Sequence, residues 1–276
     1  MTIAVPNKGR LKEPAFKLLE EVGIKPSNGN ERKLLVPTSD PGVRILMARC
    51  MDIPLMVERR AADLGIAGQD IIAERRSKVR ELLKLDFGSC TVALAAPEGI
   101  EKPKSIATAL PNVTADFCKR KGLDAEIIEL SGALESVPEL GIAEAIVDQV
   151  VTGDTLAENR LRILDSIMQS SVYLIGNYQS LEMNEEECYR VELCVKAVLE
   201  ARNRLFLEVN AETAEIRDAL IELLPAMKRP NLSDLTDGGY VVGAAVPRKG
   251  LMDLIVNLKA AGGTDIIVGP LKMVIP

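Results

Sequence analysis

The sequence predicts an α/β fold followed by a smaller domain, on three observations. Short apolar runs alternate with amphipathic stretches as far as about residue 177, which predicts a mostly parallel sheet flanked by helices. From residue 204 the order becomes strand, helix, strand, strand, helix, strand, the pattern of a ferredoxin-like βαββαβ unit. A length of 276 residues with 47% hydrophobic residues suits two or three small domains with cores of their own.

The first elements follow from periodicity and turn residues. Residues 2–6 are expected to form a strand. Apolar residues at 11, 15, 18, 19 and 22 predict an amphipathic helix that ends at Gly23. Strands are expected in "KLLVPTSDPG" and "VRILMAR", around a turn at residues 40–42. A helix, a strand at Leu64–Ala67 and a second helix opened by Gly68-Gln69-Asp70 come next.

The later elements continue this alternation. They are expected as a long strand within 85–97, a strand at 104–109, a helix at 112–122, a strand at 125–130, a short helix within 132–141, a strand at 143–151, a helix at 156–165, a strand within 170–177 and a long helix at 184–201. The final domain is expected to hold strands in "RLFLEV", "NLSDL", "YVVGAAVP" and "TDIIVG", with helices at 212–224 and 251–261.

Composition excludes several classes of function. A net charge of −6, 3% aromatic residues and no Trp disfavour a nucleic-acid or anionic-membrane binder. Histidine is absent, which excludes His-dependent triads, His metal ligands and an imidazole base. Five cysteines at irregular spacing, without C-x-x-C, suggest neither zinc site nor disulfide framework. No apolar run approaches the roughly 18 residues of a membrane span, so we expect a cytoplasmic protein.

The stretch "AIVDQVVTGDTLAEN" at 145–159 carries the main chemical signal. One interpretation is a helix capped by Thr155, since Thr155 and Glu158 fit the S/T-x-x-E capping box. The other is a phosphate cradle, in which hydroxyls, a glycine and main-chain N–H groups meet an anion. An acid at 154 is unfavourable to phosphate unless its side chain turns outward. Asp148, where the strand ends, could accept hydrogen bonds from sugar hydroxyls, and the combination predicts a ribose 5-phosphate site.

With this stretch and several others, the sequence resembles the long-form ATP phosphoribosyltransferases. The resemblance extends nearly end to end through "NKGRL", "RCMDIPLMVERRAADLGIAGQD", "ATALPNVT", "GALESVPELGIAEAIVDQVVTGDTL" and the terminal βαββαβ module. It implies two periplasmic-binding-protein-like α/β lobes and a C-terminal ferredoxin-like regulatory domain. The implied bounds are 1–88 with 177–201 for the first lobe, 89–176 for the second and 202–276 for the regulatory domain.

The resemblance also implies the reaction and its partners. Adenine N1 of ATP is joined to phosphoribosyl pyrophosphate (PRPP) with Mg²⁺, pyrophosphate leaves, and histidine biosynthesis begins. The nucleophile is a ring nitrogen lone pair, so a protein without histidine can carry out this chemistry. Histidine is the implied feedback inhibitor, and the protein is expected to be a homo-oligomer (dimer or hexamer). Neither nucleic acid nor a membrane is expected as a partner. The metal ligands stay unassigned.

Site residues carry over by position. Asp148 is expected to bind the ribose hydroxyls. The resemblance also implies that Asp148, Lys8 and Arg49 are catalytic. The remaining PRPP contacts are Thr152, Gly153, Asp154, Thr155 and Leu156. The ATP contacts are Arg10, Arg49, Asp70 and Glu135, and the effector contacts are Asn210 and Asn231. The chain departs from the family pattern at Cys50-Met51, Asp154, Asn210 and Asn231.

Other interpretations remain open. Lys8 and Arg10 could lie in an ordinary solvated loop, Asp70 could be a helix N-cap, and the last domain could mediate oligomer contact without regulation. A type I salvage phosphoribosyltransferase has a similar loop, but it carries paired acids where this chain has Asp148 and Gln149. A two-lobed solute-binding protein without enzymatic activity would share the lobes, because a fold does not determine a function.

Overall fold

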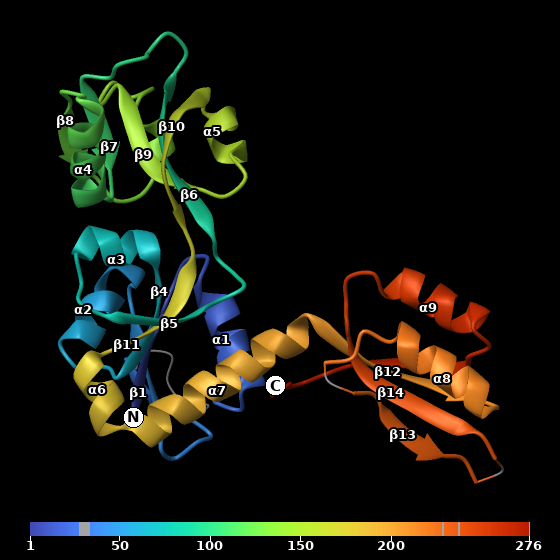
Figure 1. Ribbon diagram of the computed structural model, residues 1–276. Helices are drawn as coiled ribbons and strands as arrows, with labels where there is room; N and C mark the ends of the chain where they lie inside the picture. The colour runs from blue at the N-terminus through green and yellow to red at the C-terminus, as the bar shows by residue number, and fades with distance from the viewer. Residues whose placement is uncertain (28–33, 228, 237, 276) are drawn as a thin grey trace. The chain divides into compact units, whose positions relative to one another are not determined.

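The structure is a computed structural model that describes residues 1–27, 34–227, 229–236 and 238–275 (Figure 1). Lys33, the first residue of the expected strand stretch "KLLVPTSDPG", lies outside the described residues. The chain divides into two compact units, Met1–Glu192 and Leu193–Pro276. The first unit holds a six-stranded and a five-stranded sheet, and the second a four-stranded sheet. We call the parts built on the first two sheets the first lobe and the second lobe.

The first lobe has the strand order β2-β3-β1-β4-β11-β5. Its strands are β1 (Thr2–Pro6), β2 (Leu35–Pro37), β3 (Arg44–Ala48), β4 (Leu64–Gly68), β5 (Arg80–Lys84) and β11 (Val172–Gly176). Its helices are α1 (Lys12–Glu21), the 3₁₀ turn η1 (Cys50–Asp52), α2 (Ile53–Glu58), α3 (Gln69–Arg75) and α6 (Tyr178–Met183). The central strand β1 is parallel to both β3 and β4. The loops that follow these three strands therefore leave the same edge of the sheet, where open α/β sheets bind ligands.

The second lobe has the strand order β10-β6-β9-β7-β8. Its strands are β6 (Cys90–Pro97), β7 (Ser105–Thr108), β8 (Glu126–Glu129), β9 (Ala145–Val150) and β10 (Leu161–Ser170). Its helices are α4 (Pro111–Lys121), the 3₁₀ turn η2 (Leu134–Ser136) and α5 (Asp154–Glu158). The core joins Phe117 of α4 to buried aliphatic residues of β6, β7 and β9. This packing fixes β9, the strand that leads into the 145–159 stretch.

The expectation of a mostly parallel sheet is wrong in detail, because both sheets are mixed. Strand β6 runs antiparallel to β9 and β10, and β11 runs antiparallel to β4 and β5. The chain passes between the two sheets between β5 and β6 and returns between β10 and β11. These returning segments need no crossover helix, so they can pair in the antiparallel sense.

The expected helix at 156–165 is also wrong. Helix α5 ends at Glu158, and Leu161–Ser170 is a ten-residue strand with two bulges against β6. Its apolar residues allow either structure when considered locally. The unpaired edge of β6 decides the outcome, because ladder hydrogen bonds over that length outweigh local helix preference.

The sheet pairing also shifts one expected boundary. Val172–Gly176 belongs to the six-stranded sheet of the first lobe and therefore lies outside the second lobe, contrary to the expected range 89–176. The junction falls between β10 and β11, at Ser171. The compact C-terminal unit begins at Leu193, inside the long helix α7 (Glu185–Arg202), rather than at residue 202.

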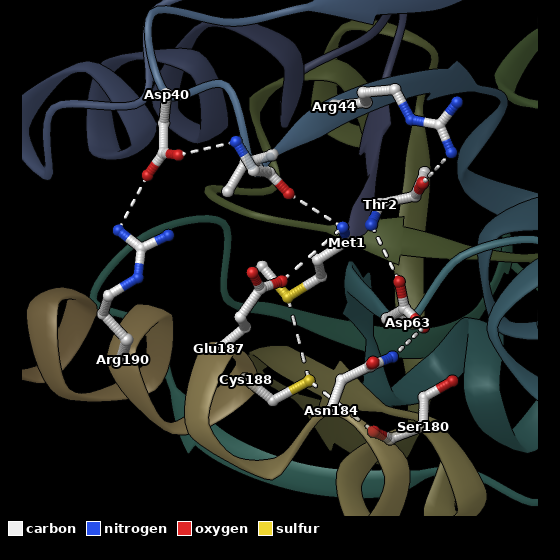
Figure 2. A network of polar contacts seen from close by, with 12 residues as sticks. Met1, Thr2, Asp40, Arg44, Asp63, Ser180, Asn184, Glu187, Cys188 and Arg190 are labelled. Atoms are coloured by element: carbon white, nitrogen blue, oxygen red, sulfur yellow. Dashed lines mark hydrogen bonds and ion pairs between the residues drawn. The ribbon is translucent and has the colours of Figure 1, made fainter.

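Polar contacts attach Asn184 and the start of α7 to the first lobe (Figure 2). Arg190 forms an ion pair with Asp40 at 2.7 Å. The carboxylate of Asp63 accepts hydrogen bonds from the main-chain N–H of Thr2 at 2.8 Å and from the Asn184 side chain at 3.3 Å. Burial beside these groups raises the pKa of the Cys188 thiol to about 11. That cysteine is therefore a protonated packing residue at neutral pH.

The C-terminal unit has the ferredoxin-like order β13-β14-β12-β15, antiparallel throughout. Its elements are β12 (Arg204–Ala211), α8 (Ala214–Leu223), β13 (Asn231–Asp234), β14 (Tyr240–Pro247), α9 (Leu251–Ala260) and β15 (Thr264–Pro270). Alternate residues of β12 and β14 pack with Leu220 of α8 and Leu258 of α9. The expected βαββαβ order is confirmed.

Candidate functional site

The loop after β9 forms a turn before a short helix, but not by the expected cap. Helix α5 begins at Asp154, its N-cap is Gly153 with φ +89°, and no side chain caps it. The capping box on Thr155 is therefore wrong, because the left-handed glycine turns the chain and starts the helix early enough to include Thr155. The first-turn N–H groups at 154–156 have no acceptor within the helix. The turn thus presents main-chain donors, as an anion cradle requires.

A pocket of about 140 Å³ opens at this turn. Its lining residues are Glu135, Asp148, Gln149, Val150, Val151, Thr152, Gly153, Thr155 and Leu156. Glu135 comes from η2, and the rest come from the end of β9, the turn at 151–153 and the start of α5. The exposed Asp154 carboxylate instead accepts a hydrogen bond from the Thr152 hydroxyl at 2.7 Å. Most of the expected phosphate and ribose contacts therefore share one pocket.

Asp148 is the half-buried acid of this pocket. Its Oδ1 accepts a hydrogen bond from the main-chain N–H of Gln149 at 2.7 Å. Burial raises the pKa of the Asp148 carboxyl, the Gln149 N–H counteracts that rise, and the negative charge of Glu135 adds to it. A group that donates hydrogen bonds to the Asp148 carboxylate, or a nearby cation, would relieve this unfavourable environment.

A second group of site residues lies at the carboxyl edge of the first-lobe sheet. Lys8 follows β1 and Arg49 follows β3, and the bond from Asn7 N–H to the Ala48 carbonyl at 2.8 Å holds the two loops together. Both cationic side chains are exposed, and neither forms a hydrogen bond or ion pair with another described residue. Burial raises the pKa of the Cys50 thiol, and the charges of Arg10, Asp70 and Lys8 also act on it. Charges that follow β1 and β4 therefore act on the thiol that follows β3.

Arg10 is committed to other contacts. Its guanidinium donates hydrogen bonds to the Gly88 carbonyl, to Cys90 Sγ at 3.1 Å and to Gln149 Oε1 at 3.5 Å. Gly88 lies between the two lobes and Gln149 belongs to the second lobe. Arg10 is thus a bridge between the lobes in this conformation and not an open anion ligand.

Asp70 is buried, with 1% of its surface exposed. Its carboxylate accepts hydrogen bonds from the Ser170 hydroxyl at 2.6 Å and from the Gln149 amide. The N-cap of α3 is Gly68, with no side-chain cap, so the helix N-cap interpretation of Asp70 is wrong. Asp70 instead connects α3 of the first lobe to β9 and β10 of the second.

The partners of these bridges are not predicted from the sequence. Gln149 stands in the sequence where a second acid would be expected, and in the structure it contacts both Arg10 and Asp70. Ser170 and Glu74 also join the lobes, through Asp70 and through helix α4. Neither has a local motif. Only the pairing of β10 with β6 and the contact of α3 with α4 bring them to their partners.

The expected effector residues lie on one face of the C-terminal sheet. Asn210 pairs with Val241, and Asn231 pairs with Gly243 two positions further along β14. The Asn210 amide donates to Asp265 at 3.1 Å. Asn231 and Arg229 line an open pocket of about 400 Å³ beside Phe206. This pocket and the 145–159 pocket belong to different units.

Among the residues that the structure describes, no three acidic or cysteine side chains gather in the arrangement of a protein metal site. None of the described helices has the length and hydropathy that a membrane crossing requires.

Comparisons with known proteins agree with this arrangement. The sequence pattern of the family described as ATP phosphoribosyltransferase matches residues 49–199, and that of the HisG C-terminal domain matches 201–273. A relative of that name from Methanothermobacter thermautotrophicus is 38% identical over 99% of both chains. Another, from Metallosphaera sedula, is 39% identical over 100% of both.

A solved structure agrees as well. It is the ATP phosphoribosyl transferase (HisG:HisZ) complex from Thermotoga maritima, at 31% identity and a TM-score of 0.65. The alignment covers 71% of this chain and 95% of that one. With two family patterns in order and full-length relatives above 30% identity, this chain belongs to the ATP phosphoribosyltransferase family.

Proposed function

We propose that this protein joins adenine N1 of ATP to the ribose of PRPP, with release of pyrophosphate, as the first step of histidine biosynthesis. The pocket at the end of β9 carries the proposal, because one small cavity combines a main-chain donor turn with a half-buried carboxylate. Those are the groups that a 5-phosphate and a ribose diol need. Membership in the family supports the same reaction.

The turn holds the PRPP phosphate in this proposal. The N–H groups of the first turn of α5 and the hydroxyls of Thr152 and Thr155 donate to its oxygens, beside Gly153 and Leu156. The Thr152 hydroxyl must then leave the Asp154 carboxylate that it contacts in the structure. Asp154 contributes its main-chain N–H and turns its acidic side chain outward. The turn therefore positions the sugar rather than acting chemically on it.

Asp148 accepts hydrogen bonds from the ribose hydroxyls. Its carboxylate is close enough to Glu135 for the charge of Glu135 to raise its pKa. Two donor hydroxyls of the sugar replace the water that burial removes from this carboxylate. The negative charge also stabilises the positive charge that grows at the sugar carbon as pyrophosphate leaves.

The first-lobe edge receives the polyphosphates. Lys8 and Arg49 have exposed cationic ends at adjacent strand termini, where they can neutralise the charge that develops on pyrophosphate. Arg10 joins them once its bonds to Gly88 and Gln149 are exchanged for phosphate oxygens. Asp70 and Glu135 are assigned to the nucleoside of ATP, and for Asp70 this also requires release of its bridging contacts.

A divalent metal ion is general in this family, and we assign Mg²⁺ here. Mg²⁺ commonly binds substrate phosphates with one or two carboxylates and several waters. Asp148 and Glu135 supply two oxygen donors at one pocket, so the residues present fit such an ion. When bound, it neutralises pyrophosphate charge and makes it a better leaving group.

The C-terminal unit is assigned to regulation by histidine. Asn231 at the open pocket and Asn210 nearby on the same sheet face offer amide donors and acceptors to an amino acid. We further propose that residues 1–88 with 172–192, and residues 89–170, are the two catalytic lobes of a cytoplasmic homo-oligomer. Removal of residues 203–276 should abolish inhibition by histidine, and inhibition that survives would place the effector elsewhere.

A pyrophosphate-release assay tests the proposed function. Release that requires both ATP and PRPP supports it, with phosphoribosyl-ATP identified as the product. Release with a free purine or pyrimidine base but not with ATP would instead favour salvage chemistry. Binding of a small solute without any turnover would favour a two-lobed binding protein.

A further inference from the structure

Helix α4 of the second lobe has no cap of its own. Its N-cap position is Leu110, its first residue is Pro111, and its first turn contains no acidic residue. The N–H groups of Asn112 and Val113 therefore need an acceptor from elsewhere, because the first turn of a helix has none internally.

Glu74 supplies that acceptor from the other lobe. It lies on α3, which contacts α4 (Figure 1), and only 4% of its surface is exposed. Its carboxylate accepts from Asn112 N at 3.1 Å, from Asn112 Nδ2 at 3.0 Å and from Val113 N at 3.0 Å. The Asn112 amide also donates to the Glu74 carbonyl at 3.1 Å. One buried acid thus receives three hydrogen bonds from the opposite lobe.

The electrostatics favour this position for a carboxylate. A negative charge is stabilised at the N-terminal end of a helix, where unpaired N–H groups and the helix dipole point toward it. Among the described residues Glu74 has no ion pair, so these N–H groups are what compensates its burial. Removal of the Glu74 carboxylate while the lobes stay together would leave the buried N–H of Val113 without an acceptor, which is costly.

A buried chain of hydrogen bonds leads from this contact to the PRPP pocket. Thr108, at the end of β7, is fully buried; its hydroxyl accepts from the Leu110 N–H at 2.9 Å. The same hydroxyl donates to the carbonyl of Val147 at 2.8 Å. Val147 directly precedes Asp148 on β9. The backbone that carries Asp148 is therefore attached to the start of α4, which Glu74 holds from the first lobe.

We propose that Glu74 is a positioning residue for the transfer reaction. By capping α4 from the first lobe, it holds the start of α4, Thr108 and Val147 in place. The Asp148 carboxylate and the phosphate turn then face the cationic edge of Lys8 and Arg49. This role goes beyond the substrate contacts and rests on the proposed function.

The main test uses Glu74→Gln in the full-length protein. The amide keeps the size of the side chain and one acceptor, and it loses the charge and the second acceptor. We expect the KM for PRPP to rise about tenfold or more, while the KM for ATP stays within about twofold. Hydrogen exchange at Asn112 and Val113 should become faster, with an unchanged circular dichroism spectrum.

Thr108→Val provides a second variant that leaves the Glu74 contact intact and removes the hydroxyl that holds Val147. It should raise the KM for PRPP in the same direction. The two changes interrupt the same chain of hydrogen bonds. The double variant should therefore raise the KM for PRPP by less than the product of the two single-variant factors. Asp116→Asn is the matched control. It breaks the exposed ion pair between the lobes, Arg76–Asp116 at 3.3 Å, and should leave both KM values unchanged.

The outcomes separate this inference from the proposed function. If the wild-type protein does not use ATP with PRPP, the proposed function fails. If it does, and Glu74→Gln and Thr108→Val leave the KM for PRPP unchanged, the positioning role is overturned. Equal increases in the KM for ATP and the KM for PRPP would also overturn it, because they would indicate a general structural defect. Should Glu74→Gln fail to fold, Thr108→Val decides alone.

Discussion

The two regions that would meet phosphate groups are built differently. The turn at 152–156 is one continuous segment whose donors are presented by a left-handed glycine and a helix start. The carboxyl edge of the first-lobe sheet collects charged residues from three separate strand ends. Two of its members, Arg10 and Asp70, already bind the second lobe, whereas Lys8 and Arg49 are exposed. At the turn only the Thr152 hydroxyl has to leave a partner, the Asp154 carboxylate, because the main-chain donors are already presented. At the edge, Arg10 and Asp70 have to exchange contacts between the lobes for contacts with substrate.

Replacement of Asp148 should have the largest effect, because it removes the charged acceptor of the ready-made pocket. We expect Asp148→Asn to lower kcat/KM for PRPP by roughly 100-fold, from the loss of charge-assisted hydrogen bonds to two hydroxyls. Steady-state kinetics with saturating ATP would measure it. An Asp148→Asn enzyme with unchanged kcat/KM would contradict the ribose assignment.

The exposed cations should come next. Lys8→Ala and Arg49→Ala should each lower kcat/KM by about tenfold and leave the free energy of unfolding unchanged, because neither side chain has a partner among the described residues. Arg10→Ala should reduce activity and also destabilise the fold, because it loses bonds to Gly88 and Cys90. Urea denaturation beside kinetics would separate the two groups. If Lys8→Ala lowered the free energy of unfolding as much as Arg10→Ala, the distinction between exposed and bridging cations would be contradicted.

Asp70 tests whether a residue of this edge stabilises the contact between the lobes. Asp70→Asn should lower the free energy of unfolding by about 1–3 kcal/mol, because buried acceptors of Ser170 and Gln149 are disturbed. A role in nucleotide contact alone would instead raise the KM for ATP at unchanged stability. Chemical denaturation of the variant, with the KM for ATP measured in parallel, distinguishes these results.

The pH dependence of stability should report the cost of Asp148. Its pKa in the folded protein is raised, mainly by burial, so the folded state binds the proton more tightly than the unfolded state. Below the ordinary value of 3.8 the acid is protonated in both states and adds no cost. As the pH rises through the elevated pKa, ionisation destabilises the fold. Asp148→Asn should therefore be more stable than wild type at neutral pH, and this difference should shrink toward about pH 4.

The smallest effect should come from Asp154. Its exposed carboxylate holds the Thr152 hydroxyl and repels a phosphate, so Asp154→Asn should lower the KM for PRPP by about twofold to fivefold. The effect should diminish at high salt, because exposed charges are screened. A raised KM would mean that the acid itself contributes to binding.

The regions also differ in how far the sequence predicts them. The 148–156 site is contiguous, so its hydroxyls, glycine and acid are visible as a motif, and the structure places most of them at one pocket. The βαββαβ order is equally local and is confirmed. The bridges made by Gln149, Ser170 and Glu74 join positions far apart in the chain. Nothing in their neighbourhoods specifies which side chain they meet.

The two main errors have the same origin. Local periodicity predicts a helix over 156–165, and the bounds implied by the family resemblance place Val172–Gly176 in the second lobe. Neither guide takes sheet pairing into account. Pairing with β6 in one case and with β4 and β5 in the other decides both outcomes. The capping error at Thr155 is smaller, since a left-handed Gly153 starts the helix before the motif.

The most direct test is a crystal structure of the protein with PRPP bound and no ATP present. We predict the 5-phosphate within hydrogen-bond distance of the main-chain N–H groups at 153–156, with the ribose hydroxyls on Asp148. Density for PRPP at another location, with the turn after β9 free of ligand, would contradict it.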